Sequence, residues 1–283
     1  MNIFVFGSNG MLGRYVSKYL SQYYNIINII RNDIDASIIN EIDLHNKLIL
    51  LGANKNDVII NCIGTIKPMV DKLGDINSIM VNSVFPRTLS NVSKKIGTNL
   101  IHPTTDCVFS GQKGLYIETD NHDVSNIDIY ARTKSLGEPN DCTLIRTSII
   151  GEEINQNRSL IEWIKNNKNK KISGYLNHFW NGITCLEFAK ICHTLIKSQK
   201  YWIGVRHIYS NAINKYELTT LINSSYNLGI EILPVKVNDS VDRTLSSIYN
   251  NEKWIELGHP SIIIPDLKTQ IKEMKHFRKI LEK

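Results

Sequence analysis

The first thirteen residues constrain the fold of this chain more than any other stretch. Residues 2–6 (NIFVF) form an apolar run of strand length, and Gly7, Gly10 and Gly13 follow it at intervals of three before a helical pattern begins. Glycines at this spacing permit a tight turn, a close approach of the backbone to a ligand and close packing of the helix. Free amide groups at the start of a helix also attract anions. The stretch therefore predicts a strand, a phosphate-binding turn and a helix that together hold a dinucleotide.

Strands and helices alternate regularly after this turn. Apolar runs of strand length lie at residues 25–30, 57–64 and 143–151, and helical spacing returns across residues 76–96. Such alternation argues for a parallel sheet that is covered by helices on both faces. We therefore expect an α/β fold: a Rossmann doubly wound parallel sheet with a smaller α+β lobe that binds the substrate.

The pattern changes after Gly151. Residues 152–184 carry polar turns and aromatic side chains, which suit a binding surface better than a further strand and helix of the same kind. A helix at 186–196 and a strand at 205–209 then return to the sheet. We expect a dinucleotide-binding domain formed by residues 1–151 and 185–210, and a smaller binding lobe formed by residues 152–184 and 211–283.

Two positions indicate how a dinucleotide would be bound. Arg31 follows the second apolar run, where a domain of this kind contacts the adenosine ribose. An arginine there can bind a 2′-phosphate, so NADPH is favoured over NAD, although Asp33 and Asp35 lie close by and a solvated arginine is the alternative. Gly64 ends the third run, where the backbone can pass close to the cofactor.

Residues 101–138 hold the candidate catalytic groups. Tyr130 and Lys134 are four apart, so on a helix both point into the same cleft. The ammonium would lower the tyrosine pKa from about 10 toward neutrality, which suits a general acid. Thr105 and Cys107 are two apart, so on a strand they share a face while Asp106 points away. An isolated pair such as Tyr130 and Lys134 is often only a surface contact, so the surrounding motifs decide its meaning.

The composition excludes several classes of protein. With 42% hydrophobic and 21% charged residues the chain is an ordinary globular protein, and no apolar run reaches the roughly 18 residues of a membrane span. No secretory signal is visible, so we expect a cytoplasmic protein. The net charge of +6 is distributed and mixed with acids, which argues against nucleic acid as a partner.

Two further features concern the cysteines and the last segment. Five cysteines are scattered without a CxxC or metal-ligand spacing, so we expect neither a disulfide framework nor a metal site. Residues 268–283 are basic and carry apolar side chains at helical spacing. We expect a terminal amphipathic helix that docks on the body of the protein, with a membrane-surface or partner helix as the alternative.

Several motifs follow one another along the chain: Gly7-x-x-Gly10-x-x-Gly13, Asn61-Cys62-Ile63-Gly64, Val81-Asn82, Thr104-Thr105-Asp106-x-Val108-Phe109-x-Gly111, Tyr116-x-Glu118, Tyr130-x-x-x-Lys134 with Gly137-Glu138, and Arg146-Thr147-Ser148. In this order they resemble the motifs of the dTDP-4-dehydrorhamnose reductase family, within the extended short-chain dehydrogenases. The resemblance covers nearly the whole chain and implies an NADPH-dependent 4-reductase of a nucleotide-activated 4-keto-6-deoxyhexose, with residues 152–184 and 211–283 as the nucleotide-sugar-binding lobe. The alternative is a non-catalytic binding subunit of the same fold, because a regulatory subunit of methionine adenosyltransferase resembles the same reductases.

The resemblance implies roles for individual residues. Thr105 and Tyr130 would hold the C4 carbonyl of the sugar, Tyr130 would protonate it, and Lys134 would also bind the nicotinamide ribose. The expected cofactor-binding residues are Gly7, Asn9, Gly10, Met11, Leu12, Gly13, Arg31, Cys62, Ile63, Gly64, Tyr130 and Lys134. The expected substrate-binding residues are Asn82, Thr105, Asp106, Cys107, Arg158, Asn177, His178, Trp180, Asn181 and Arg243. For residues 177–181 a packed loop between the lobes is the alternative.

Cys107 departs from the family pattern, which has a tyrosine at this position. It matches an acid/base cysteine of related epimerase-reductases such as GDP-fucose synthase and UDP-rhamnose synthase, so Cys107 would also be a catalytic residue if the protein epimerises the sugar. That role requires nearby cations to lower the thiol pKa, and a second group to return the proton. Arg158 aligns with that group but is a poor proton donor, and His178 is the other candidate. A small apolar side chain that fills a strand end is the alternative for Cys107.

The resemblance also bears on the substrate and on partners. Residues 174–184 look like those of reductases that act on UDP-2-acetamido-2,6-dideoxy-4-hexuloses on the way to L-rhamnosamine-type sugars. A UDP- or dTDP-sugar is therefore the expected partner. A homodimer is compatible with the sequence.

Overall fold

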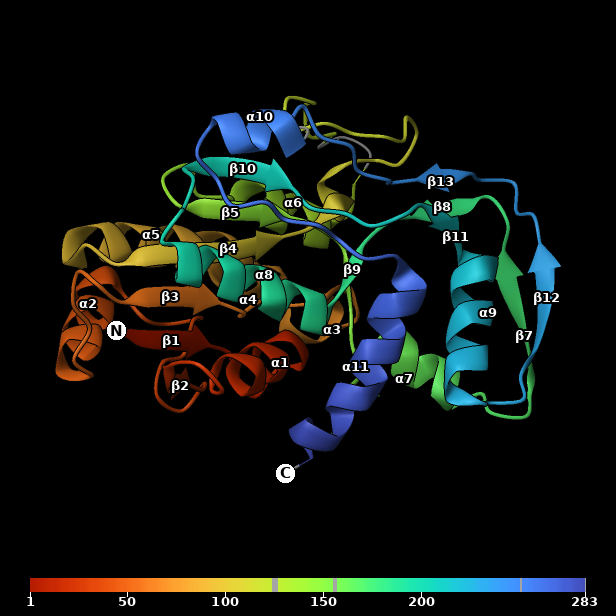
Figure 1. Cartoon of the computed structure of the whole chain (residues 1–283), viewed down its shortest axis with the longest axis horizontal. Coiled ribbons are helices and arrows are strands. Elements are labelled where there is room, and N and C mark those ends of the chain that lie inside the picture. Colours follow the sequence, from red (N-terminus) through yellow and green to blue (C-terminus); the bar gives the residue numbers. More distant parts are fainter. Residues whose placement is uncertain (124–126, 155–156, 250, 283) are drawn as a thin grey trace.

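A six-stranded parallel sheet forms the centre of the protein in the computed structural model, which describes residues 1–123, 127–154, 157–249 and 251–282 (Figure 1). Its neighbouring strands all pair in parallel. The chain runs from β1 to β2 on one side and then crosses to β3 on the other, so the carboxyl ends of β1 and β3 border the crevice in which such sheets bind ligands. The predicted doubly wound sheet is confirmed. Its strands, from edge to edge, are β2 (Asn25–Ile29), β1 (Asn2–Phe6), β3 (Val58–Asn61), β4 (Asn99–Thr104), β5 (Thr143–Arg146) and β10 (Gly204–His207).

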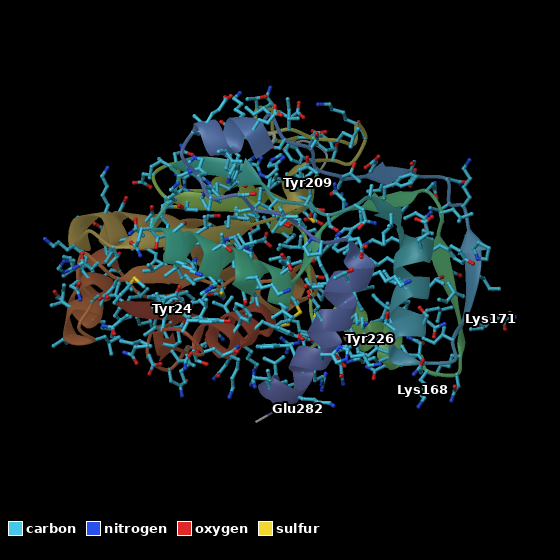
Figure 2. The ribbon with its side chains drawn as sticks, in the orientation of Figure 1. Tyr24, Lys168, Lys171, Tyr209, Tyr226 and Glu282 are labelled. Atoms are coloured by element: carbon cyan, nitrogen blue, oxygen red, sulfur yellow. The ribbon has the colours of Figure 1, made fainter. Side chains whose placement is uncertain are left out.

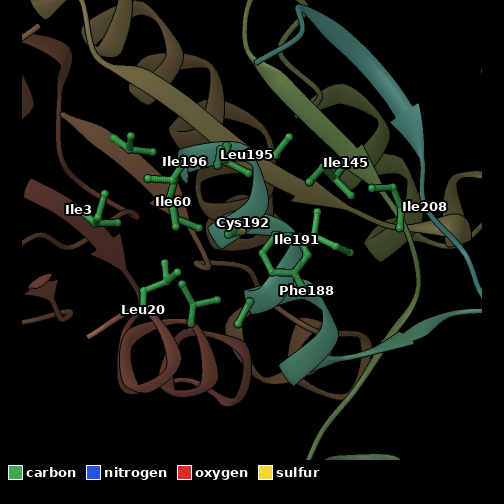
Figure 3. Close-up of a cluster of buried hydrophobic side chains, with 14 of the residues drawn as sticks. Ile3, Leu20, Ile60, Ile145, Phe188, Ile191, Cys192, Leu195, Ile196 and Ile208 are labelled. Carbon is green, nitrogen blue, oxygen red and sulfur yellow. The ribbon is translucent and has the colours of Figure 1, made fainter. Parts of the chain in front are cut away.

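Both faces of this sheet are covered by helices. Alternate residues of β1 enter two different cores: Ile3 and Val5 face α1 (Met11–Leu20) and α8 (Cys185–Ser198), while Phe4 faces α2 (Glu41–Leu50) and α5 (Phe85–Ile96). Burying each such side chain contributes about 1.5–3 kcal/mol, which explains why both faces of the strand are apolar. Figure 3 shows the first core, in which Ile3, Ile60 and Ile145 of three strands lie against α8, which contributes Phe188, Ile191 and Leu195.

A smaller lobe lies beyond the carboxyl ends of the central strands, on the right of Figure 1. In it α9 (Lys215–Tyr226) packs on a two-stranded parallel sheet and contacts α7 (Leu160–Lys165). Lys168 and Lys171 lie at the end of this lobe far from the central sheet (Figure 2). The strands of the lobe are β7 (Lys171–Tyr175) with β12 (Glu231–Val235), and β8 (His178–Trp180) between β11 (Ile213–Asn214) and β13 (Val241–Asp242).

The last helix joins the two parts. α11 (Leu267–Leu281) contacts α1 and α8 of the larger part and α9 of the lobe, and its apolar face, including Met274 and Phe277, is buried. The predicted docking of a terminal amphipathic helix is confirmed, although Ile280 stays 42% exposed. None of the helices in the described part of the chain has the length and apolar character of a membrane span.

One segment of the expected lobe packs elsewhere. Trp254, in α10 (Asn251–Glu256), stacks edge-on against Trp202 with ring centroids 4.9 Å apart, next to β10 of the central sheet. The division of the chain at residues 151, 184 and 210 stays a prediction. The short elements that connect these parts are α3 (Lys67–Leu73), α4 (Asp75–Ile79), a π-helical turn (Met80–Val84), a 3₁₀ turn (Asp106–Val108), α6 (Ile129–Leu136), and β6 (Ile149–Ile150) paired with β9 (Ile183–Thr184).

Candidate active site

The glycine turn after β1 is packed so tightly that side chains do not fit. Gly7 has φ +71°, a conformation that L side chains rarely adopt, and the Gly10 N–H donates to its carbonyl oxygen at 2.9 Å. A Cβ on Gly13 would overlap the Gly7 carbonyl oxygen, and a Cβ on Gly7 would lie 3.0 Å from Ile63 and 3.1 Å from the Cys62 backbone. The turn is therefore pressed between the start of α1 and the end of β3.

A small pocket opens beside this turn. It has a volume of about 90 Å³, and Arg31 at its mouth is 65% exposed, with Nε 3.8 Å from Asp35 Oδ2. The first amide groups of α1 have no partner within the helix and are free to bind a ligand. The Met11 and Leu12 side chains do not face the pocket, because they pack against the apolar cores of the protein. Asn9 is exposed on the turn itself. The residues that line the pocket are Gly7, Arg31, Ile34, Ala36, Ile63 and Val81.

Tyr130 and Lys134 lie one turn apart on α6, as the sequence predicted. Asp128 fixes the start of this helix, because its side chain accepts a hydrogen bond from the Ala131 N–H at 2.9 Å. Lys134 reaches back to the end of β3, where a Cβ on Gly64 would lie 2.6 Å from its Nζ. The helix thus places an ammonium group directly at the carboxyl edge of the sheet.

Asn82 holds α6 in this position. It lies in the π-helical turn, a feature frequent at functional sites, and its carboxamide accepts from the Thr65 N–H at 2.8 Å and donates to the Thr65 carbonyl and to Thr133 Oγ1, both at 3.1 Å. Ser83 Oγ donates to the Thr133 carbonyl at 2.6 Å. Because the Asn82 amide is engaged within the protein, its expected contact with substrate stays a prediction.

Residues 105–107 do not continue the strand, which corrects the sequence-based expectation. β4 ends at Thr104, and Thr105 caps a 3₁₀ turn by accepting the Cys107 N–H at 3.1 Å. Asp106 does not point away: its Oδ1 accepts the Thr105 hydroxyl at 3.2 Å and the Cys107 thiol at 3.5 Å. Side chains of Thr and Asp offer the backbone local hydrogen bonds that compete with strand pairing. All three side chains therefore gather on one turn.

The protonation behaviour of these groups is governed by burial. Burial raises the pKa of Tyr130, and the nearby Cys107 adds to this against a hydrogen bond from Thr105 that lowers it. The expected lowering of the Tyr130 pKa is wrong, because burial of the phenol disfavours phenolate. Burial lowers the pKa of Lys134 to about 8, against the Glu138 carboxylate that raises it. Burial, and then Asp106, raise the pKa of Cys107 to about 12.

Two cations face this turn from the smaller lobe. Arg243, which follows β13, donates from Nε to the Phe109 carbonyl at 2.9 Å. Lys215, the first residue of α9, has its Nζ 5.3 Å from the centroid of the Trp180 ring. Burial raises the pKa of Asp106, and the charges of Arg243 and Lys215 oppose that rise. The arrangement brings a proton donor, a hydroxyl and positive charge together at the carboxyl edge of the sheet, on the side of the smaller lobe.

Comparison with known families identifies the group to which this site belongs. The family model described as the RmlD substrate binding domain matches residues 1–276. The chain belongs to the RmlD family. The predicted resemblance to the dTDP-4-dehydrorhamnose reductases is thereby confirmed.

Solved structures similar to this RmlD-family chain show the same fold. A dTDP-4-dehydrorhamnose reductase from Bacillus anthracis in complex with NADP is 20% identical, covers 97% of this chain and 98% of its own, and has a TM-score of 0.79. A dTDP-4-dehydrorhamnose reductase ortholog from Clostridium acetobutylicum is 18% identical, covers 99% and 100%, and has a TM-score of 0.77. MoeE5 in complex with UDP-glucuronic acid and NAD is 12% identical, covers 98% and 100%, and has a TM-score of 0.71.

A curated relative matches part of the RmlD-family chain. The dTDP-4-keto-6-deoxy-D-glucose reductase from Streptomyces niveus is 29% identical over 153 residues, which cover 51% of each chain. The chain therefore matches about half the length of this relative.

The loop of residues 177–181 packs inside the smaller lobe of this RmlD-family protein and is hydrogen-bonded to its backbone. Asn177 exchanges two hydrogen bonds with the Val237 backbone at 2.8 and 3.2 Å, and Asn181 does the same with the Leu245 backbone at 2.7 and 2.9 Å. Trp180 is 4% exposed and lies in the lobe core. His178 is half-buried, with Nε2 3.0 Å from the Asp239 carbonyl oxygen. These contacts fit the packed-loop alternative, and direct contacts with substrate stay a prediction.

Arg158 is not among the groups that surround Cys107. It is exposed, and its backbone N–H donates to Glu153 at 2.6 Å before α7. Residues 155–156 of the segment aligned with the epimerase partner lie outside the described residues. The cation that opposes the rise of the Cys107 pKa is Arg243 instead.

Neither Lys215 nor the buried ion pair between Glu138 and Arg146 was predicted from the sequence as part of the site. Glu138 accepts two hydrogen bonds from Arg146, at 3.1 and 2.6 Å, and one from Thr104 Oγ1 at 3.0 Å, which ties α6 to the ends of β4 and β5. Both residues stood in the recognised motifs, but sequence alone does not pair them. The only signal for Lys215 was the Asn214-x-x-Glu217 capping box, which marks the start of α9.

Proposed function

We propose that this RmlD-family protein is an NADPH-dependent 4-reductase of a nucleotide-activated 4-keto-6-deoxyhexose. The observation that carries the proposal is the position of Tyr130 and Lys134, which α6 brings to Thr105 and Gly64 at the carboxyl edge of the sheet. The names of the Streptomyces niveus relative and of the Bacillus anthracis structure point to the same reaction class.

The residues at the glycine turn fit a nicotinamide dinucleotide. Because Gly7 and Gly13 have no Cβ, the turn packs closely against the start of α1 and the end of β3. The free amide groups at the start of α1 would bind a pyrophosphate, and the apolar pocket walls suit an adenine. Arg31 at the pocket mouth would bind a 2′-phosphate, which favours NADPH, although Asp35 competes for its guanidinium. When bound, the reduced nicotinamide supplies hydride. The NADP and NAD complexes of two structural neighbours support this cofactor class.

The chain's own residues would handle the proton. As the C4 carbonyl is reduced, its oxygen gains negative charge, and Tyr130 donates its phenolic proton to that oxygen. The raised pKa keeps the phenol protonated at neutral pH, so the donor form is present before the reaction. Thr105 would fix the phenol through their hydrogen bond. Lys134 would bind ribose hydroxyls beside Gly64.

Substrate recognition is proposed for the side of the crevice that the smaller lobe forms. Arg243 and Lys215 bring positive charge to the Asp106 turn, which suits a nucleoside diphosphate. The names of the relatives favour a dTDP-sugar, and a UDP-2-acetamido-2,6-dideoxy-4-hexulose is the second candidate. Epimerisation at C3 by Cys107 is not favoured, because the raised thiol pKa leaves little thiolate at neutral pH.

A panel of sugars tests the proposal. The protein is incubated with NADPH or NADH and with dTDP- or UDP-linked 4-keto-6-deoxy sugars, with and without a 2-acetamido group, while the nicotinamide absorbance is followed. Oxidation of NADPH with one of these sugars supports the reductase. Tight NADPH binding without oxidation by any sugar would support the non-catalytic binding subunit instead.

A further inference from the structure

One carboxylate oxygen of Asp106, beside Tyr130, accepts hydrogen bonds from two side chains. Asp106 Oδ1 accepts the hydroxyl of Thr105 at 3.2 Å and the thiol of Cys107 at 3.5 Å, on a turn in which Asp106 is only 5% exposed. The residue that departs from the family pattern is thus hydrogen-bonded to a buried carboxylate that directly precedes it in the chain.

These bonds fix where the Thr105 proton goes. A threonine hydroxyl has a single proton, and here Asp106 accepts it. One of the two Oγ1 lone pairs accepts the Cys107 N–H at 3.1 Å. The Thr105 hydroxyl, the Cys107 thiol and the Cys107 backbone N–H are therefore held together on one turn around Asp106.

The Asp106 carboxylate also disfavours ionisation of the Cys107 thiol, whereas the surrounding cations favour it. The charged and titratable groups that face Cys107 are Asp106 on its own turn, Tyr130 on α6, Arg243 after β13 and Lys215 on α9. Arg243 and Lys215 would favour a thiolate, but burial of the thiol and the negative charge of Asp106, which is hydrogen-bonded to the sulfur at 3.5 Å, disfavour it. The thiol therefore keeps its proton.

We propose that Asp106 is a positioning residue that accepts the hydrogen bond of the Cys107 thiol and holds Cys107 as a neutral thiol, so that the site reduces the C4 ketone without exchanging the neighbouring C–H. The consequence for the sugar rests on the proposed function. The state of the thiol does not, because it is a property of the protein alone.

Alkylation of Cys107 tests the proposal without any substrate. The rate of iodoacetamide labelling of the Cys107 peptide is measured by mass spectrometry from pH 6 to 10 in wild type, Asp106→Asn and the matched control Asp120→Asn, which removes a surface carboxylate paired with Lys113. Wild type is expected to label with an apparent pKa well above the ordinary value of about 8.5. Asp106→Asn is expected to label at least about tenfold faster at pH 8, because each unit of pKa changes the thiolate fraction tenfold. Asp120→Asn should match wild type.

A wild-type Cys107 that labels with a pKa at or below about 8.5 would overturn the proposal, and this result does not depend on whether Asp106→Asn folds. Equal labelling of folded Asp106→Asn and wild type would overturn it as well. A second arm follows deuterium from solvent into C3 and C5 of the 4-keto sugar without NADPH, where wild type should incorporate none and Asp106→Asn a measurable amount. Failure to reduce any sugar would reject the proposed function, and the labelling result would still decide the role of Asp106.

Discussion

The Lys134 ammonium lies against Gly64, where a Cβ would be 2.6 Å from Nζ. Two segments 70 residues apart in the chain meet here: the end of β3, which also packs against the glycine turn, and the helix that carries Tyr130. Because Gly64 has no side chain, the ammonium can reach the edge of the sheet next to the proposed cofactor site. This contact links cofactor binding to the position of the proton donor.

Adding a methyl group at this contact should misplace the ammonium while leaving the fold intact. In Gly64→Ala the new Cβ meets the flexible end of Lys134, which can move away, so the temperature midpoint of unfolding should change little. Displacement of a binding group by about 1 Å can cost on the order of 10²-fold in turnover. Steady-state kinetics should show a fall in kcat/KM for NADPH of that order. Unchanged kinetics would mean that the position of Lys134 does not matter.

The glycine turn should tolerate no side chain at Gly13. In Gly13→Ala the Cβ overlaps the Gly7 carbonyl oxygen, which is backbone and cannot rotate away, so we expect a loss of stability of about 1–3 kcal/mol. Urea unfolding and NADPH fluorescence titration should show both the destabilisation and weaker cofactor binding. The control is Gly52→Ala, where φ is +83° but nothing lies within 4 Å. It should lose about 1–2 kcal/mol from backbone strain and bind NADPH normally; weaker binding in both variants would argue against a specific role of the turn.

Burial of Lys134 should make stability depend on pH in a defined direction. Its pKa falls from 10.5 to about 8 in the folded protein, so between these values the unfolded chain binds more protons and stability rises with pH. Lys134→Met should therefore be more stable than wild type at pH 7, by on the order of 2 kcal/mol, and this advantage should shrink as the pH rises through 8 toward 10. Urea unfolding at pH 7 and pH 10 measures it. A difference that does not change with pH would show that the ammonium is well solvated.

The buried Glu138–Arg146 pair should be costly to break. Arg146→Met leaves a buried carboxylate with fewer partners, which destabilises by about 3–5 kcal/mol. The matched control is Lys95→Ala, which breaks an exposed pair with Glu41 and should change stability little, because solvent screens exposed ion pairs. Chemical unfolding of both variants compares them. Equal losses would show that the buried pair does not fix α6 to the sheet.

Local patterns in the sequence were enough to predict the frame of the site. The glycine turn and the Tyr130–Lys134 pair each depend on residues a few positions apart, and the sheet follows from alternating apolar runs. The turn at Asp106 was not predicted, because side-chain hydrogen bonds to the neighbouring backbone ended the strand at Thr104, before Thr105, Asp106 and Cys107.

Contacts between distant segments account for most of the remainder. The charge of Lys215 acts on Asp106 from the other part of the protein, and the periodicity of the sequence does not show that these two residues lie near each other. Trp180 and Asn181 looked like a binding loop because aromatic and amide side chains also suit a ligand. In the structure Trp180 packs β8 into the lobe core, and Asn181 is hydrogen-bonded to the Leu245 backbone. The pKa of Tyr130 was misjudged because the sequence showed its partner and not its burial.

The central claim is that Tyr130 gives the proton that completes reduction at C4. The most direct measurement compares wild type with Tyr130→Phe under saturating NADPH and the sugar that wild type reduces, by the decay of nicotinamide absorbance, with NADPH affinity measured separately by fluorescence. We predict a loss of turnover of about 10²- to 10⁴-fold with NADPH affinity within about twofold of wild type. Reduction by Tyr130→Phe at the wild-type rate would contradict the assignment.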